Sequence, residues 1–255
     1  MNQSIIKALS LLDFFSEERP ELSLKEITEL VQLPKPTVYR LLSSLEYCGF
    51  LTKTRDSDYD KRYRLGLKLM ELGQLVSDQL ELRKISLPFM KELANDINEV
   101  VHLVIVHQDE AVYIEKVEST HALRLYTRIG KRSPLYLGSG PKLLLAYLSD
   151  EKRKAIIEKT TLQDFKKDLL SKDRLMMELE EIQRNGFSVS YGEQDEGTIG
   201  ISFPIYNYYG EVIASLAVSG PYYRFEGRNL ENIKDKTRII SKKISSELGH
   251  RSCSI

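Results

Sequence analysis

The chain has 255 residues, of which 42% are hydrophobic and 29% charged, and its 37 basic residues balance its 37 acidic ones. This length suits two domains, and the composition is that of an ordinary globular protein. The chain has only two cysteines, which is too few for a disulfide framework. It has no apolar run of about 20 residues that could span a membrane and no leader pattern, so we expect a cytoplasmic protein.

Two short amphipathic helices are predicted at the start of the chain. Apolar residues at spacings of three and four, from Ile5 to Phe15, form one helical face, with Ser4 as the expected N-cap. The second helix begins after Ser23, which forms a capping-box pattern with Glu26. We expect its buried stripe to comprise Leu24, Ile27, Leu30 and Val31.

The third predicted helix, residues 35–45, has two chemically different faces. Pro36 suits its first turn, where the missing amide hydrogen costs nothing. The apolar face is expected to be core and contains Val38, Leu41, Leu42 and Leu45. The opposite face carries groups that suit phosphates and base edges in the major groove. It contains Thr37, Arg40 and Ser44, with Tyr39 and Ser43 on its flanks.

After Gly49 the hydrophobic period changes from helical to extended. Residues 50–55 and 61–65 are predicted strands around a turn at 56–60, which makes a hairpin, or wing. Eight basic and four acidic residues between Lys35 and Lys68 give this region a local charge of +4. A positive charge concentrated in this way is expected of a surface that binds DNA.

Each of these features has a simpler explanation when it is taken alone. Three amphipathic helices often form a small domain with no nucleic-acid role. A basic hairpin is often a solvated edge that discourages strand pairing, and Arg40 could pair with a neighbouring acid. The order of capped helix, tight turn, polar-faced helix, glycine and basic hairpin favours a winged helix-turn-helix that binds DNA.

The rest of the chain predicts a helical connector and then an α+β domain. Residues 66–82 and 82–97 are expected to be amphipathic helices, with Pro88 as a kink or restart. Strands are expected at residues 100–108, 111–117, 123–126, 188–191, 199–206 and 211–218, and helices at 142–148, 150–159, 171–185 and 230–248. This order predicts a central antiparallel sheet packed by helices. The expected division is a DNA-binding domain at 1–66, a helical linker at 67–82 and an effector-binding domain at 83–255.

The segment from Leu137 to Lys142 is a candidate ligand site. Ser139 or Gly140 can cap the following helix, and free amides at the positive end of a helix dipole attract a carboxylate or phosphate. A well-capped helix start without any ligand explains the same motif more simply.

The sequence offers no catalytic or metal-binding pattern. The four histidines form no His-x-x-x-His pair, and His102 and His107 would face opposite sides of one strand. Glu193 and Asp195 are expected to be solvated turn residues rather than a general acid and base. No cofactor is expected. One alternative is a hydrolase or transferase with an accessory helix-turn-helix, but the sequence shows no catalytic constellation for it. Another is an architectural DNA binder, which would not need the second domain.

Several segments together resemble the IclR family of bacterial transcription regulators. In the first domain they are Pro34–Leu42, Gly49–Leu51 and Tyr63–Gly66. In the second they are Gly130–Tyr136, Lys142–Ala146, Gly186–Phe187, Gly192–Glu193, Gly197, Pro204–Ile205 and Ser219–Pro221. The resemblance covers nearly the whole chain and rests on the order and spacing of these segments.

The resemblance implies a homodimer or homotetramer, more often a repressor, that binds double-stranded operator DNA and a small organic acid. The expected DNA-binding residues are Ser23, Lys35, Pro36, Thr37, Tyr39, Arg40, Ser43, Ser44, Lys53, Arg55 and Arg62. The ligand is expected at the amides of Ser139 and Gly140, beside Ser190, Gly200, Ala217 and Ser219. Because serine and glycine stand at 190 and 200, where the family often has an acid and a thiol, we expect a roomier and less acidic cavity.

Overall fold

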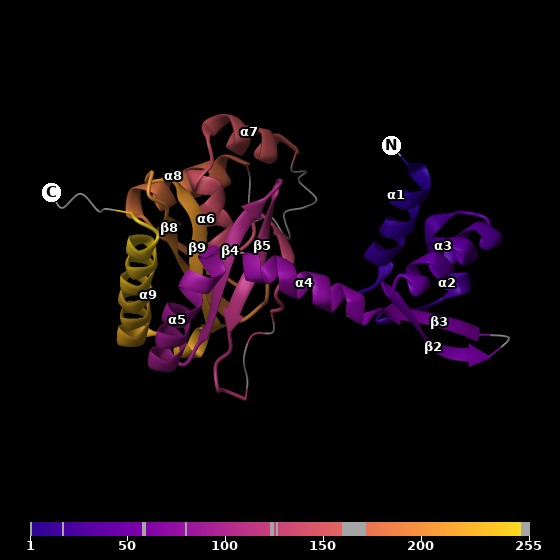
Figure 1. Cartoon of the computed structure of the whole chain (residues 1–255). Coiled ribbons are helices and arrows are strands. Elements are labelled where there is room, and N and C mark those ends of the chain that lie inside the picture. Colours follow the sequence, from indigo (N-terminus) through magenta and orange to yellow (C-terminus); the bar gives the residue numbers. More distant parts are fainter. Residues whose placement is uncertain are drawn as a thin grey trace. The chain divides into compact units, whose positions relative to one another are not determined.

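The computed structural model describes residues 2–16, 18–57, 60–79, 81–122, 125, 127–159 and 172–250. The chain divides into two compact units, Met1–Gln79 and Leu80–Ile255 (Figure 1). The division falls inside the segment expected to be the linker, so the helix of that segment is grouped with the first unit. Each unit has its own hydrophobic core.

The first unit contains a winged helix-turn-helix. Its elements are α1 (Gln3–Ser10), the 3-10 helix η1 (Leu11–Phe14), β1 (Glu21–Ser23), α2 (Leu24–Val31), α3 (Lys35–Tyr47), β2 (Leu51–Ser57), β3 (Asp60–Leu65) and α4 (Leu67–Gln79). The strands form an antiparallel sheet in the order β1-β3-β2. The predicted hairpin is confirmed, and β1, which the sequence did not predict, extends it.

Local capping sets the helix ends of this unit. The capping box is confirmed, because Ser23 Oγ accepts the amide hydrogen of Glu26 at 3.2 Å and the Glu26 carboxylate accepts that of Ser23 at 2.7 Å. The predicted cap of the first helix is wrong. Asn2 is the N-cap there, and its Oδ1 accepts the amide hydrogen of Ser4 at 3.0 Å.

The buried faces of α1 and α2 are narrower than predicted. In α2 only Ile27 is fully buried, and Leu30, predicted to be core, is exposed. In α1 no residue is buried, and Ile5 and Leu9 are 57% and 48% exposed. Amphipathic spacing alone therefore marks an apolar face without showing what covers it.

The second unit is an α+β domain. Its elements are α5 (Glu81–Ile97), β4 (Val100–His107), β5 (Glu110–Val117), β6 (Arg132–Pro134), α6 (Ser139–Tyr147), α7 (Asp150–Lys159), α8 (Lys172–Asn185), β7 (Ser188–Tyr191), β8 (Thr198–Tyr206), β9 (Val212–Pro221), the 3-10 helix η3 (Tyr222–Arg224) and α9 (Gly227–Glu247). The strands form one antiparallel sheet in the order β6-β5-β4-β9-β8-β7. The predicted α+β fold with a central antiparallel sheet is confirmed.

One predicted detail of this unit differs from the structure, one lies mostly outside the described residues, and one observed strand was not predicted. Pro88 lies inside the continuous helix α5, so the helix does not restart there. The predicted strand at 123–126 lies outside the described residues except for Leu125, which is not in a strand. The short strand β6 pairs with β5 and was not predicted, because three residues give too little periodicity.

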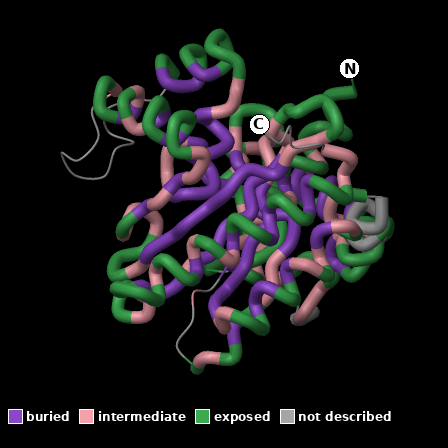
Figure 2. The backbone as a smooth tube through the Cα atoms, turned by 90° about the vertical axis from the view of Figure 1, so that its left-hand side faces the viewer, coloured by how far each residue is buried: buried purple, intermediate pink, exposed green. Residues whose placement is uncertain are grey.

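Helices pack on both faces of this sheet, and Figure 2 shows the buried backbone running along the strands between them. One face packs with α5 and α9, through residues such as Leu103, Leu216 and Ile201. The other packs with α6, α7 and α8. Because side chains alternate along a strand, residues such as Ser215 and Ala217 face α6, and a Cβ built on Gly140 of α6 would lie within 3.6 Å of both.

A close contact between two backbone segments joins the end of α3 to the wing and to α4. The Gly66 amide donates a hydrogen bond to the Phe50 carbonyl at 2.8 Å. A Cβ on Gly66 would lie 2.1 Å from the Gly49 carbonyl oxygen, and Gly49 has a φ of +78°, which favours glycine. No side chain fits at position 66 without moving the backbone.

We therefore expect Gly66→Ala to lower the free energy of unfolding of the first unit by about 3 kcal/mol or more, because a backbone contact must open. Gly73→Ala is the matched control: Gly73 is exposed in α4, no atom lies within 4 Å of its added Cβ, and alanine favours the helix by about 1 kcal/mol. Thermal unfolding followed by circular dichroism compares the two. Equal stability of the two variants would contradict the close contact.

Candidate functional site

The exposed face of α3 is the first candidate site. The four residues expected to be core are buried: Val38, Leu41, Leu42 and Leu45. Pro36 occupies the first turn as expected. Arg40 and Tyr39 are exposed, whereas Thr37 and Ser43 are half-buried. The Ser44 hydroxyl donates to the backbone carbonyl of Arg40 at 3.0 Å.

Basic residues of the wing lie next to this face. The Lys61 ammonium group of β3 lies 5.8 Å from the centre of the Tyr39 ring, so α3 and the wing form a continuous surface there. Lys53 of β2 is paired with Glu46 of α3 at 2.8 Å. Arg55 lies opposite Arg62 in the sheet, and its side chain lies outside the described residues. Of the sequence-predicted set, Ser23 serves as a helix cap.

A pocket at the start of α6 is the second candidate site. It contains about 470 Å³ of empty space, including the part open to solvent. All six residues expected to hold a ligand line it: Ser139, Gly140, Ser190, Gly200, Ala217 and Ser219. The lining that the sequence did not predict includes His102, Tyr113, Leu125, Thr127, Gly138, Glu193, Gln194, Asp195, Thr198 and Ile199.

The register of the sheet explains how these residues meet. Directly paired residues across neighbouring strands form two rows, with Ser190, Gly200 and Ser219 in the first and Ala217 and His102 in the second. A Cβ on Gly200 would lie 2.7 Å from Ser139 Oγ. The small residues of these rows therefore allow the first turn of α6 to approach the sheet, and the pocket lies at that junction.

Gly138 is the N-cap of α6, so neither Ser139 nor Gly140 has the capping role expected of it. Gly138 has a φ of +91°, and its amide donates to the Glu193 carboxylate at 2.9 Å. A Cβ at this position would lie 2.7 Å from Gln194 Nε2. Glycine is thus required at the residue where the loop after β7 contacts the start of the helix.

The loop at residues 192–197 is fixed to α6 by a buried ion pair. Lys142 is fully buried and pairs with Glu193 at 2.5 Å and with Glu178. The Glu193 side chain is only 19% exposed, so the expectation of a solvated turn residue is wrong for Glu193, although Asp195 is exposed as expected. The carboxylates of Glu193 and Asp195 both line the cavity, and Lys142 balances the charge of Glu193.

His102 lies at the buried side of the pocket. It is 2% exposed, its ring meets that of Tyr113 edge-on at 5.4 Å, and among the described residues neither ring nitrogen has a hydrogen-bond partner. Burial, together with the charges of Lys116 and Lys131, lowers the pKa of His102 to about 3, so the ring is neutral at neutral pH. An unpartnered buried polar group of this kind costs about 1–3 kcal/mol.

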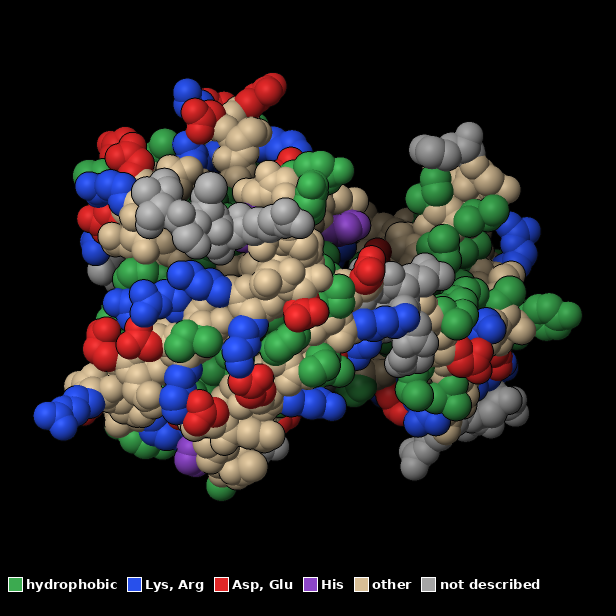
Figure 3. Space-filling view, turned by 60° about the vertical axis from the view of Figure 1, so that its left-hand side comes forward, with side chains coloured by type: hydrophobic (Ala, Val, Ile, Leu, Met, Phe, Trp, Pro, Cys, Tyr) green, Lys and Arg blue, Asp and Glu red, His purple; other side chains and the backbone are tan. Residues whose placement is uncertain are grey.

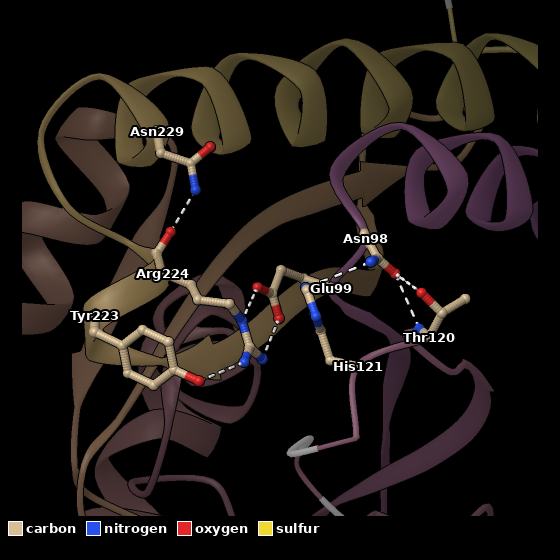
Figure 4. A network of polar contacts seen from close by, with 7 residues as sticks. All are labelled: Asn98, Glu99, Thr120, His121, Tyr223, Arg224 and Asn229. Carbon is tan, nitrogen blue, oxygen red and sulfur yellow. Dashed lines mark hydrogen bonds and ion pairs between the residues drawn. The ribbon is translucent and has the colours of Figure 1, made fainter.

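Polar contacts hold Thr120, which Figure 4 shows beside Asn98, and Thr127, which lines the pocket. Asn98 Oδ1 accepts hydrogen bonds from the backbone and the hydroxyl of Thr120, each at 2.9 Å. The Lys116 ammonium group binds the Thr127 carbonyl.

An ion pair lies beside this anchor. Glu99, next to Asn98 and 2% exposed, accepts two hydrogen bonds from Arg224 at 2.5 and 2.9 Å (Figure 4). The pair ties the turn before β4 to η3, which follows β9. Within the described part of the chain, no group of three or more histidine, cysteine or acidic residues could hold a metal ion. No described helix is both long and apolar enough to cross a bilayer.

Comparison with known families matches both units. Residues 4–55 match the IclR helix-turn-helix domain, and residues 74–246 match the bacterial transcriptional regulator IclR C-terminal domain. The HTH-type transcriptional regulator KipR of Bacillus subtilis is 37% identical over 250 residues, which cover 98% of both chains. The HTH-type transcriptional regulator KdgR of Escherichia coli is 32% identical, with 97% of this chain and 93% of that protein covered.

Solved structures show the same fold over nearly the whole chain. The IclR protein of Thermotoga maritima superposes with a TM-score of 0.76 at 28% identity and covers 97% of this chain and 99% of its own. An IclR homologue of Microbacterium hydrocarbonoxydans, solved in complex with 4-hydroxybenzoate, superposes with a TM-score of 0.82 at 24% identity and covers 96% and 99%.

We expect Lys142→Met to lower the free energy of unfolding by about 3 kcal/mol, because it leaves the carboxylates of Glu178 and Glu193 without their buried partner. Lys159→Met is the matched control, since Lys159 and Asp109 form an ion pair whose side chains are 70% and 61% exposed, and it should change stability by less than about 0.5 kcal/mol. Urea denaturation measures both. If the two variants lose the same stability, the buried pair does not hold the loop.

Proposed function

The chain belongs to the IclR family of bacterial transcription regulators, and from this premise we propose that it is a cytoplasmic repressor whose operator binding is modulated by a small organic acid. Residues 1–66 bind DNA, 67–82 link the domains and 83–255 bind the effector. The observation that carries this proposal is the convergence of all six expected ligand residues on one pocket at the start of α6. The role is one of binding rather than catalysis.

The reader helix of the proposal is α3, with its N-terminal turns in the major groove. Its exposed Arg40 has the donors that recognise a base edge, and the half-buried Thr37 lies one turn before it. The wing contacts phosphates. The proposed set is Ser23, Lys35, Pro36, Thr37, Tyr39, Arg40, Ser43, Ser44, Lys53, Arg55 and Arg62. Lys53 must exchange Glu46 for a phosphate when DNA binds.

The effector carboxylate binds at the first turn of α6. The first amides of a helix have no partner within the helix, and the dipole favours a negative charge there. At this end the Gly138 amide is already bound to Glu193, which leaves those of Ser139 and Gly140 to the ligand. Crystallisation of the Microbacterium homologue with 4-hydroxybenzoate, a carboxylic acid, supports this class of effector.

Exposed apolar side chains of the first unit support a homo-oligomer, either a dimer or a tetramer. On α1 they are Ile5, Ile6 and Leu9, and on α4 they are Leu67, Met70, Leu72 and Leu75. Figure 3 shows such hydrophobic side chains gathered at the molecular surface. Exposed apolar side chains grouped in this way are typical of a protein interface. A dimer would place two α3 helices on half-sites about 34 Å apart.

We expect Arg40→Ala to weaken specific DNA binding by about 1–3 kcal/mol without changing the melting temperature, because the side chain is exposed and its loss removes one base contact. The DNA is the duplex that the wild-type protein enriches from a random library, and a gel-shift titration gives the affinity. Arg228→Ala, which removes an exposed guanidinium from α9, is the control. Wild-type affinity of Arg40→Ala would remove Arg40 from the recognition surface.

We expect Gly200→Ala to abolish the response to the effector, because the added methyl group would lie 2.7 Å from Ser139 Oγ and 3.1 Å from Ser190 Oγ, inside the pocket. Ser202→Ala is the control, since Ser202 faces the same side of β8 two residues further on and does not line the pocket. Operator release is followed against effector concentration. A folded Gly200→Ala protein that follows the wild-type titration would place the effector elsewhere.

A further inference from the structure

We propose that His102 hydrogen-bonds a hydroxyl group of the effector, so that the natural ligand of this pocket is an aliphatic hydroxy acid rather than an unsubstituted or an aromatic carboxylic acid. The inference rests on the proposed function, because it names the class of acid that the pocket at the start of α6 takes.

The position of His102 is the first ground. It stands in β4 directly opposite Ala217 of β9, in the second row of the pocket floor. It is 2% exposed, and both of its ring nitrogens lack a partner among the described residues. No other pocket-lining residue that the structure describes has a buried side-chain polar atom without a partner. Buried polar groups in native proteins are nearly always hydrogen-bonded, so this one calls for a partner from outside the chain.

The rest of the pocket lining is also rich in hydrogen-bonding groups. Six residues contribute hydroxyl groups: Tyr113, Thr127, Ser139, Ser190, Thr198 and Ser219. The apolar side chains of the lining are those of Leu125, Ile199 and Ala217. The hydroxyl groups of Tyr113 and Thr198 already bond Gln194 and the Asp195 carbonyl. A hydrocarbon chain or an aromatic ring would cover the other four without offering them a hydrogen-bond partner, whereas a hydroxylated chain offers one.

The charge of the ring decides between a hydroxyl and a second carboxylate. Because burial holds its pKa near 3, His102 is a neutral imidazole, with one nitrogen that donates and one that accepts. A hydroxyl group matches such a ring because it also donates and accepts. A second carboxylate would only accept, and it would enter a pocket whose lining already includes Glu193 and Asp195.

The alternative is that His102 only packs against Tyr113, whose ring it meets edge-on. The two roles predict different variants. Leucine fills the same space without polar atoms, so a packing role predicts that His102→Leu preserves ligand selectivity. A recognition role predicts that it removes selectivity while leaving the unliganded protein at least as stable, because an unpartnered polar group has gone.

The test uses the full chain and pairs of acids matched in carbon number: glycerate with propionate, threonate with butyrate, and gluconate with hexanoate, with 4-hydroxybenzoate as the aromatic acid. Thermal shift and calorimetric titration give the affinities.

We expect at least one hydroxylated acid to bind tenfold or more tightly than its unsubstituted partner. In His102→Leu this preference should fall about tenfold, the change expected for one lost hydrogen bond. His102→Gln should retain part of it, and His107→Leu, at the exposed histidine of β4, should match the wild type.

Three results overturn the inference. The first is that the wild type binds an unsubstituted acid or 4-hydroxybenzoate as tightly as the hydroxylated acids, or more tightly. This result leaves the proposed function intact. Undiminished selectivity in His102→Leu also leaves it intact and assigns His102 to packing. If no acid of either set binds, the inference fails together with the proposed organic-acid effector.

Discussion

The first turn of α6 lies directly against the sheet, and the ligand pocket depends on this close approach. Gly200 makes it possible, because even one methyl group there would meet Ser139. Lys142 and Glu193 then fix the neighbouring loop to the helix at 2.5 Å. A helix start brought this close to the strands presents its amides and its dipole to a pocket that is partly shielded from solvent. A single carboxylate would interact there more strongly than in water.

The same approach shapes the chemistry around that carboxylate. The floor of the pocket beneath the first turn of α6 carries mostly small residues, which include Gly200 and Ala217, and His102 lies directly opposite Ala217. Such a floor has little apolar surface to offer and many hydrogen-bonding groups. The proposed binding of a carboxylate and the proposed recognition of a hydroxyl group would thus both depend on this one packing constraint.

Features that depend on neighbours along the chain were predictable from the sequence. They include the capping box at Ser23, the two faces of α3 and the hairpin that follows Gly49. Features that depend on distant partners were not. Lys142 and Glu193 are 51 residues apart, and neither the burial of His102 nor the pairing of β1 with β3 has a local signal. The helix start already indicated Ser139 and Gly140, whereas Ser190, Gly200, Ala217 and Ser219 came from family resemblance, since periodicity cannot show which strands become neighbours.

The proposed regulation requires that the pocket at α6 and the surface of α3 be thermodynamically coupled. Coupling requires a ligand that binds two conformations of the protein with different affinities, and it is reciprocal. The most direct measurement is the affinity of the full chain for a binding acid in the absence and in the presence of its selected duplex. We expect the affinity for the acid to change about fivefold or more when DNA is bound, and the acid to change the affinity for DNA by the same factor. Identical acid affinities with and without DNA would contradict it.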